Sequence, residues 1–197
     1  MFSRIFYYLS IPLYIPHLLL FLIMGKKRLK EDLLCWGEVL RIKKCGIVSQ
    51  FLYLIHHLKE YRSVFYWRIG GISRLVCWYL PGMPCLFLQT LPRDVECGFV
   101  IQHGHSTQVN AKSIGTNCQI WHNVTIGKSH PGGNVPVIKN NVRIFTGAVV
   151  IGDIEIGNNV DIGACTLLTK SVPDNCLVVG NPARIVHLGV EKVNILL

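Results

Sequence analysis

Residues 136–173 read PVIKNNVRIFTGAVVIGDIEIGNNVDIGACTLLTKSVP, and they decide the fold because an apolar residue returns at every sixth position. A helix repeats every 3.6 residues and a strand every 2, so neither explains this period. The pattern predicts a solenoid of short strands joined by tight turns, with three hexapeptides in each 18-residue coil and coils about 4.8 Å apart. The same phase extends back to residue 114 and includes Ile114, Ile120, Ile126, Ile138, Ile144, Val150, Ile156, Ile162 and Leu168.

Small and flexible residues recur where this solenoid must bend. An Asn pair at 140–141 returns at 158–159, and glycines follow the aliphatic position in several hexapeptides. Gly and Asn tolerate a positive φ, so we expect both to supply left-handed corners. The glycines concerned are Gly115, Gly127, Gly157 and Gly163.

The chain as a whole is predicted to be mainly β, with an α-helical N-terminal region before the solenoid. Helical patterns cover residues 29–46, 49–69 and 72–80. An uncovered solenoid end exposes an open strand edge, so a helical cap is expected there. The predicted domains are an apolar segment at 1–28, a helical cap at 29–94, the β-solenoid at 95–188 and a tail at 189–197.

The basic character of the chain is concentrated in its N-terminal half. Residues 1–94 hold 13 Lys and Arg against 5 Asp and Glu, and the apolar run at 5–24 is followed by Lys26, Lys27, Arg28 and Lys30. This balance favours an anionic partner, and no nucleic-acid motif accompanies it. Pro12, Pro16 and His17 argue against a spanning helix. We expect residues 5–30 to contact the membrane surface, and a buried or oligomer-interface helix remains the alternative.

The eight cysteines are spaced irregularly and form no CxxC pair. This spacing favours reduced cysteines over disulfides or a zinc site. We therefore expect a cytoplasmic protein, peripheral at the inner face of the cell membrane.

Two stretches carry a resemblance to a known family. The run IGNNVDIGACTLLTKSVPDNCLVVGNPARIV at 156–186 resembles the last coils of hexapeptide-repeat acyltransferases, whose fold is a left-handed parallel β-helix. The segment GFVIQHGHS at 98–106 is similar to the one that carries the catalytic histidine of serine acetyltransferases. The resemblance, in the serine acetyltransferase-like and capsular polysaccharide O-acetyltransferase branch, supplies the handedness, and it implies a homotrimer or a dimer of trimers.

The resemblance also implies an O-acetyltransferase with acetyl-CoA as acetyl donor. His103 takes the place of the general base, which deprotonates the acceptor hydroxyl for direct transfer. A thioester is already activated, so no metal is required. The remaining candidates are Gln102, His105 and His122 for binding or orienting the acceptor, and Thr146, Ala164, Thr169, Lys170 and Arg184 for the cofactor.

Two departures from serine acetyltransferases bear on the acceptor. This chain has Gln102 where they place an Asp, and Asn134-Val135 where an Arg-His pair holds the serine carboxylate. Without that positive group, we expect a sugar hydroxyl of a surface or capsular polysaccharide, or of its lipid-linked precursor. Serine O-acetyltransferase activity in cysteine biosynthesis is the first alternative. The second is a non-catalytic solenoid scaffold.

Overall fold

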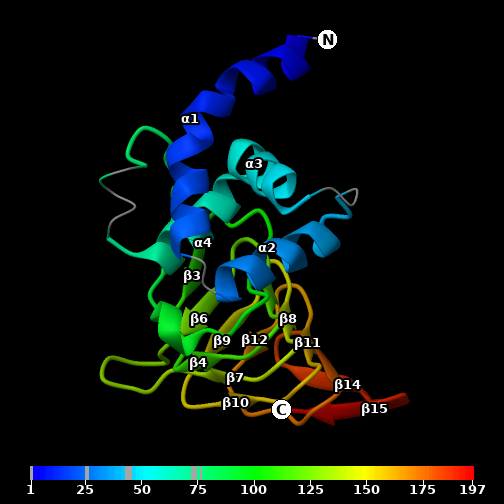
Figure 1. The fold of residues 1–197 in the computed structure, drawn as a ribbon. Coiled ribbons are helices and arrows are strands. Elements are labelled where there is room, and N and C mark those ends of the chain that lie inside the picture. Colours follow the sequence, from blue (N-terminus) through cyan, green and yellow to red (C-terminus); the bar gives the residue numbers. More distant parts are fainter. Residues whose placement is uncertain (1, 25–26, 43–45, 72–74, 76) are drawn as a thin grey trace. The chain divides into compact units, whose positions relative to one another are not determined.

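The computed structural model describes the whole chain except residues 1, 25–26, 43–45, 72–74 and 76. It divides into a helical unit, Met1–Met83, and a β unit, Pro84–Leu197 (Figure 1). The predicted helix at 72–80 lies largely outside the described residues. Among the helices that the structure describes, none combines the length and apolar character needed to cross a bilayer.

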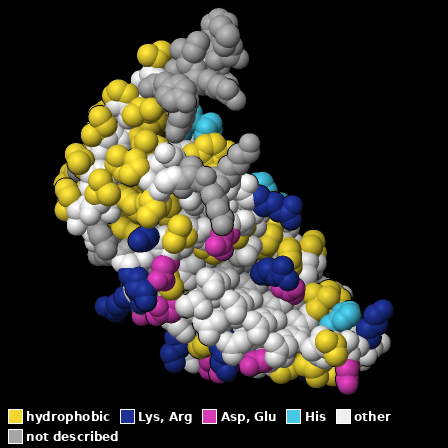
Figure 2. Space-filling model, turned by 45° about the vertical axis from the view of Figure 1, so that its right-hand side comes forward, with side chains coloured by type: hydrophobic (Ala, Val, Ile, Leu, Met, Phe, Trp, Pro, Cys, Tyr) yellow, Lys and Arg dark blue, Asp and Glu magenta, His cyan; other side chains and the backbone are white. Residues whose placement is uncertain are grey.

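Four helices form the helical unit: α1 (Phe2–Met24), α2 (Lys27–Val39), α3 (Ile47–His57) and α4 (Lys59–Ile69). One predicted helix over 49–69 is instead two, because Leu58 takes an extended backbone with φ −118°. Helix α1 continues through Pro12 and Pro16, and it packs through Phe21, whose ring stacks on Phe51 of α3 at 4.6 Å. Many apolar side chains nevertheless stay on the surface of this unit (Figure 2).

The β unit is a parallel β-helix with three faces, each a parallel sheet, and a short 3-10 turn at Pro92–Asp94 precedes its regular coils. The first face consists of β1 (Leu86–Leu88), β3 (Thr107–Val109), β6 (Thr125–Gly127), β9 (Val149–Ile151) and β12 (Leu167–Leu168). The second consists of β4 (Ser113–Ile114), β7 (Val137–Ile138) and β10 (Glu155–Ile156). The third consists of β2 (Val100–Ile101), β5 (Gln119–Ile120), β8 (Arg143–Ile144), β11 (Asp161–Ile162) and β13 (Cys176–Val179), to which β14 (Arg184–Leu188) and β15 (Glu191–Leu196) add antiparallel.

The predicted column of apolar residues is the core of this β-helix. All nine residues are at most 2% exposed. Ile144 pairs with Ile162, one regular coil later, whereas Ile120 pairs with Ile144 across 24 residues. The longer spacing arises because the loop 128–136 adds residues to one coil. Burial of each aliphatic side chain contributes roughly 1.5–3 kcal/mol, so this column is the main source of stability of the unit.

The corners use Asn and Gly for different reasons. Asn141 and Asn159 both have φ 56°, as the sequence predicted for this pair. The prediction for the glycines is wrong: Gly115, Gly127, Gly157 and Gly163 are absent from the residues with positive φ. Most of them are needed for close approach, since a Cβ on Gly157 would lie 2.5 Å from the backbone nitrogen of Asp174 on the next coil.

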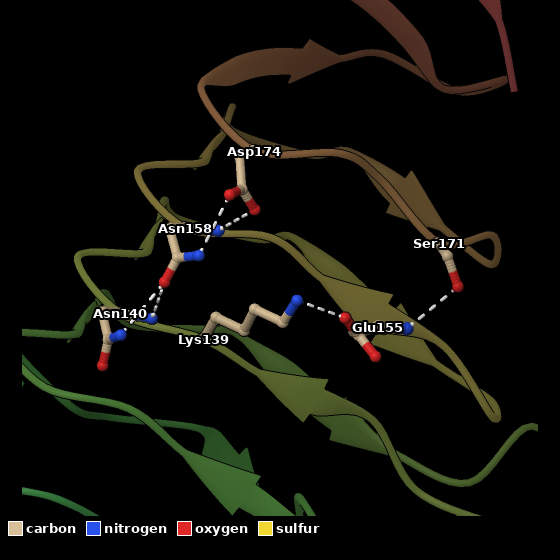
Figure 3. Close-up of polar contacts among 6 residues, drawn as sticks. All are labelled: Lys139, Asn140, Glu155, Asn158, Ser171 and Asp174. Carbon is tan, nitrogen blue, oxygen red and sulfur yellow. Dashed lines mark hydrogen bonds and ion pairs between the residues drawn. The ribbon is translucent and has the colours of Figure 1, made fainter.

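One corner is reinforced by a polar ladder that runs from coil to coil (Figure 3). The Asn158 side-chain oxygen accepts from the backbone nitrogen of Asn140 at 3.2 Å. The Asn158 backbone nitrogen donates in turn to the Asp174 carboxylate at 2.7 Å. Beside this ladder, Lys139 pairs with Glu155 at 2.5 Å. These bonds fix the rotation of one coil on the next, because each links equivalent positions of neighbouring coils.

Candidate functional site

Stacked turns between the third and first faces bring most of the predicted site residues to one edge, which we call the histidine corner (residues 102–106, 121–124, 145–148 and 163–166). Backbone hydrogen bonds join these turns. The oxygen of His105 accepts from Asn123 at 3.0 Å, and that of His122 accepts from Gly147 at 3.2 Å. The oxygen of Thr146 then accepts from Cys165 at 2.9 Å. Coil stacking therefore aligns residues that are far apart in the sequence.

Three imidazole rings meet at the histidine corner. The rings of His105 and His122 stack with centroids 4.5 Å apart, and the ring of His103 meets that of His122 edge-on at 5.7 Å. His103 and His105 are exposed, whereas Nδ1 of His122 is buried without a hydrogen-bond partner among the described residues. Burial lowers the pKa of His122, and the nearby His105 and His103 lower it further. His122 is therefore held as a neutral imidazole near neutral pH.

His103 lies at the tip of the turn that follows β2. Its φ of 64° is in the left-handed region, which residues other than Gly, Asn and Asp rarely adopt. Gly104 follows with φ 49°, so two successive left-handed residues form the tip of the turn. Strained backbone of this kind clusters at functional sites. The turn leaves the His103 ring accessible, as a general base must be.

The structure directs Gln102 away from its predicted task. Its side-chain amide donates to Oε1 of Gln119 on β5 at 3.2 Å, along the third face. Gln102 therefore stabilises the packing of two coils, and its role in orienting His103 stays a prediction.

The predicted cofactor residues separate into two groups. Thr146 and Ala164 occupy the histidine corner, on the two coils that follow His122. Thr169 and Lys170 follow β12 and so lie at the edge between the first and second faces. Arg184 is on β14, where Nη1 donates to the Asn194 side chain at 3.0 Å. Within one chain, only the first pair lies in line with the histidines.

A pocket that the sequence analysis missed lies at the edge between the first and second faces. Its volume is about 310 Å³, and the loop 128–136 forms one of its walls. Asn134 Nδ2 donates to Asp153 Oδ2 at 2.9 Å, and the backbone nitrogen of Lys112 donates to the Pro136 oxygen at 2.8 Å. We call this the loop pocket, and its lining is Lys112, Lys128, Gly133, Asn134, Val135 and Asp153.

The loop pocket combines charges of both signs. No carboxylate of the described residues lies within ion-pair distance of the ammonium groups of Lys112 or Lys128. The spacing offered a signal for this neighbourhood: one 18-residue coil beyond Lys112 lies His130, within the loop. His130 itself contacts Ser129 at 3.0 Å and does not join the other three histidines.

Metal ligation finds no support in the described part of the chain, which contains no group of three or more His, Cys, Asp or Glu arranged to hold an ion. The three histidines of the corner are therefore considered as bases and hydrogen-bonding groups.

Comparison with known proteins places the chain near one group of enzymes. Residues 136–170 match the family model "Bacterial transferase hexapeptide (six repeats)". The chain is 37% identical over 100 residues to the serine acetyltransferase of Synechococcus elongatus, covering 49% of this chain and 41% of that protein. It is 32% identical over 148 residues to the serine acetyltransferase of Buchnera aphidicola subsp. Schizaphis graminum, covering 71% of this chain and 56% of that protein. The chain spans about half the length of these relatives.

Solved structures agree with the sequence relatives. The Neisseria gonorrhoeae serine acetyltransferase in complex with serine superposes with a TM-score of 0.59 at 26% identity, covering 80% of this chain and 67% of that chain. Soybean serine acetyltransferase complexed with serine gives a TM-score of 0.59 at 26% identity, covering 79% and 67%. The left-handed parallel β-helix and the resemblance to the serine acetyltransferase-like branch of hexapeptide-repeat acyltransferases are confirmed.

The predicted polysaccharide acceptor is wrong. The sequence relatives and the structural neighbours described above are serine acetyltransferases. The prediction rested on the lack of a positive side chain at position 134. In the folded chain, Asn134 shares the loop pocket with Lys112 and Lys128, so positive charge is present there after all. These lysines come from outside the Asn134-Val135 pair, which is why a comparison of that pair alone missed them.

Proposed function

We propose that this chain, similar in sequence and fold to serine acetyltransferases, is an acetyl-CoA-dependent O-acetyltransferase whose acceptor is the hydroxyl of serine. The observation that carries the proposal is the exposed His103 at a strained turn, in line with Thr146 and Ala164 on the edge of a β-helix of this family.

In the proposed reaction His103 removes the proton from the acceptor hydroxyl. The oxygen attacks the thioester carbonyl, and a C–O bond forms as the carbonyl becomes a tetrahedral oxyanion. The C–S bond then breaks, and the leaving thiolate takes the proton back from the imidazolium of His103. A general base of this kind contributes roughly 10²–10⁴-fold in rate. The neutral His122 supports this role, because it places no positive charge beside the base.

The loop pocket suits the acceptor as a zwitterion. Lys112 and Lys128 provide ammonium groups for a carboxylate, and Asp153 provides a carboxylate for an amino group. The loop pocket and the histidine corner lie at opposite edges of the first face. We therefore propose the homotrimer that the family resemblance implies, in which the loop pocket of one protomer lies beside the histidine corner of the next.

The test is an acetyl-transfer assay with labelled acetyl-CoA and a panel of acceptors. L-Serine is expected to be acetylated with the highest kcat/KM, and serinamide and ethanolamine, which lack the carboxylate, are expected to be poor acceptors. The proposal is overturned if the assembled protein transfers no acetyl group to serine, or if the uncharged analogues match it.

A further inference from the structure

Helix α1 exposes one side that consists of apolar residues over most of its length. Between residues 5 and 24 the sequence contains no Lys, Arg, Asp or Glu. The exposed set consists of Leu9 (72%), Leu13 (54%), Ile15 (49%), Leu19 (51%), Leu22 (55%) and Ile23 (78%). At 3.6 residues per turn these side chains share one side of the helix. We call this side the α1 face, and Figure 2 shows how extensively apolar side chains cover the helical unit.

The opposite side of α1 is fixed within the protein. Tyr14 donates to or accepts from Nδ1 of His56 at 2.7 Å, and Nε2 of His17 lies 2.9 Å from the Tyr66 hydroxyl. Tyr14 and His17 are at most 4% exposed. These contacts hold the helix in the unit, so the α1 face points outward because its other side is anchored. A helix held in this way can lie on a surface but cannot insert across it.

An aromatic side chain borders the α1 face. The Tyr79 hydroxyl donates to the Leu13 carbonyl at 2.5 Å, which places the neighbouring Trp78 beside the middle of α1. Trp78 is 77% exposed. Tryptophan in this position is typical of proteins at the membrane–water interface, where its amphipathic ring sits at the level of the lipid headgroups.

Positive charge follows directly at the end of the helix. The Lys27 side chain is 87% exposed, and four residues separate it from Ile23, a distance of at most about 14 Å. Lys30 is also exposed. Residues 1–83 hold 12 Lys and Arg against 4 Asp and Glu, a net charge of +8. An apolar face bordered by Trp and Lys matches the layers of an anionic lipid surface.

We propose that the α1 face, with Trp78 and the lysines of α2, docks this protein in the plane of an anionic membrane surface. A protein partner is less well matched, because protein interfaces normally carry about one hydrogen bond per 100–200 Å² and the α1 face offers no polar side chain to make them. The inference concerns the helical unit and is independent of the acetyl acceptor.

The test is co-flotation of the full chain with vesicles of phosphatidylcholine and phosphatidylglycerol at a 3:1 ratio. Binding is expected at low salt, and it should weaken on pure phosphatidylcholine and at high salt. Leu19→Glu with Ile23→Glu should reduce the partition coefficient at least about tenfold. Lys27→Gln with Lys30→Gln should reduce it roughly fivefold per lysine, the change expected for one charge near such a surface.

The matched control is Val190→Glu, which also places a carboxylate at an exposed apolar position, 98% accessible, but in the β unit. This variant should bind vesicles like the wild type. Circular dichroism establishes that each variant is folded. The proposal is overturned if the wild type does not float with the vesicles, or if the Leu19→Glu, Ile23→Glu variant floats equally well. It is also overturned if that variant changes only the sedimentation coefficient, since a second copy would then cover the α1 face.

Discussion

The imidazole ring of His105 lies almost parallel to that of His122, with centroids 4.5 Å apart and planes inclined by 22°. A proton on either ring would repel a proton on the other, and burial of His122 adds to this effect. We predict that His105→Gln raises the pKa of His122 toward its ordinary value. Titration of the imidazole resonances by NMR measures this shift. An unchanged His122 pKa in the variant would show that burial alone sets it.

Removal of the proposed base should abolish most of the activity. His103→Ala is expected to lower kcat/KM for acetyl transfer by roughly 10²–10⁴-fold, because the acceptor hydroxyl then loses its proton acceptor. Steady-state kinetics with acetyl-CoA and serine measure the effect. His130→Ala is the matched control, since His130 lies in the loop and should leave kcat within about twofold. Equal loss in both variants would argue against His103 as the base.

Removal of the loop-pocket lysines should affect the acceptor and not the donor. Lys112→Met and Lys128→Met are each expected to raise KM for serine about tenfold, the effect of losing one charge-assisted contact. KM for acetyl-CoA should stay unchanged. Lys139→Met provides the control, because Lys139 pairs with Glu155 on the second face, away from the loop pocket. If serine KM stays at the wild-type value in both pocket variants, the acceptor carboxylate is bound elsewhere.

The corner asparagines should stabilise the β-helix through their backbone as well as their side chains. Asn159 has φ 56°, and its side chain links Asn141 and Asn175 at 2.9 and 2.8 Å. Asn159→Ala is expected to lower the free energy of unfolding by about 2–3 kcal/mol, from left-handed strain and lost hydrogen bonds together. Asn159→Gly should lose less, because glycine adopts this backbone without strain. Urea denaturation distinguishes the two, and equal losses would contradict the strain argument.

The helical unit should lose stability in mild acid because of His17. This residue is fully buried, and burial, followed by the charge of Arg62, lowers its pKa to about 4. The unfolded chain therefore binds more protons than the folded one between pH 6.5 and about 4, so stability falls as the pH drops through this range. The loss should reach up to about 3 kcal/mol.

Urea denaturation at pH 7, 5.5 and 4 measures this loss. His17→Gln should reduce the pH dependence, while His130→Gln, at an exposed loop position, should keep that of the wild type. A His17→Gln variant with the full wild-type pH dependence would assign the effect to other groups.

The β-helix could be predicted from the sequence because its signal is local. The apolar residues at Ile138, Ile144 and Val150 recur along the chain itself, and each is buried at the equivalent position of the next coil. The corner glycines show where this reasoning fails. A glycine pattern does not reveal whether φ or space is limiting, and Gly157 is limited by the backbone of Asp174, 17 residues away.

For the candidate site, the sequence by itself determined that His103 follows a short strand and that Thr146 and Ala164 occupy equivalent corners. Only the tertiary structure decided that His105 stacks on His122, that Lys112 shares a pocket with the loop, and that one side of α1 remains exposed. The physical reason is range. A six-residue period is written in neighbouring residues, whereas these contacts depend on how coils and helices stack, and on a loop that changes the coil spacing from 18 to 24 residues.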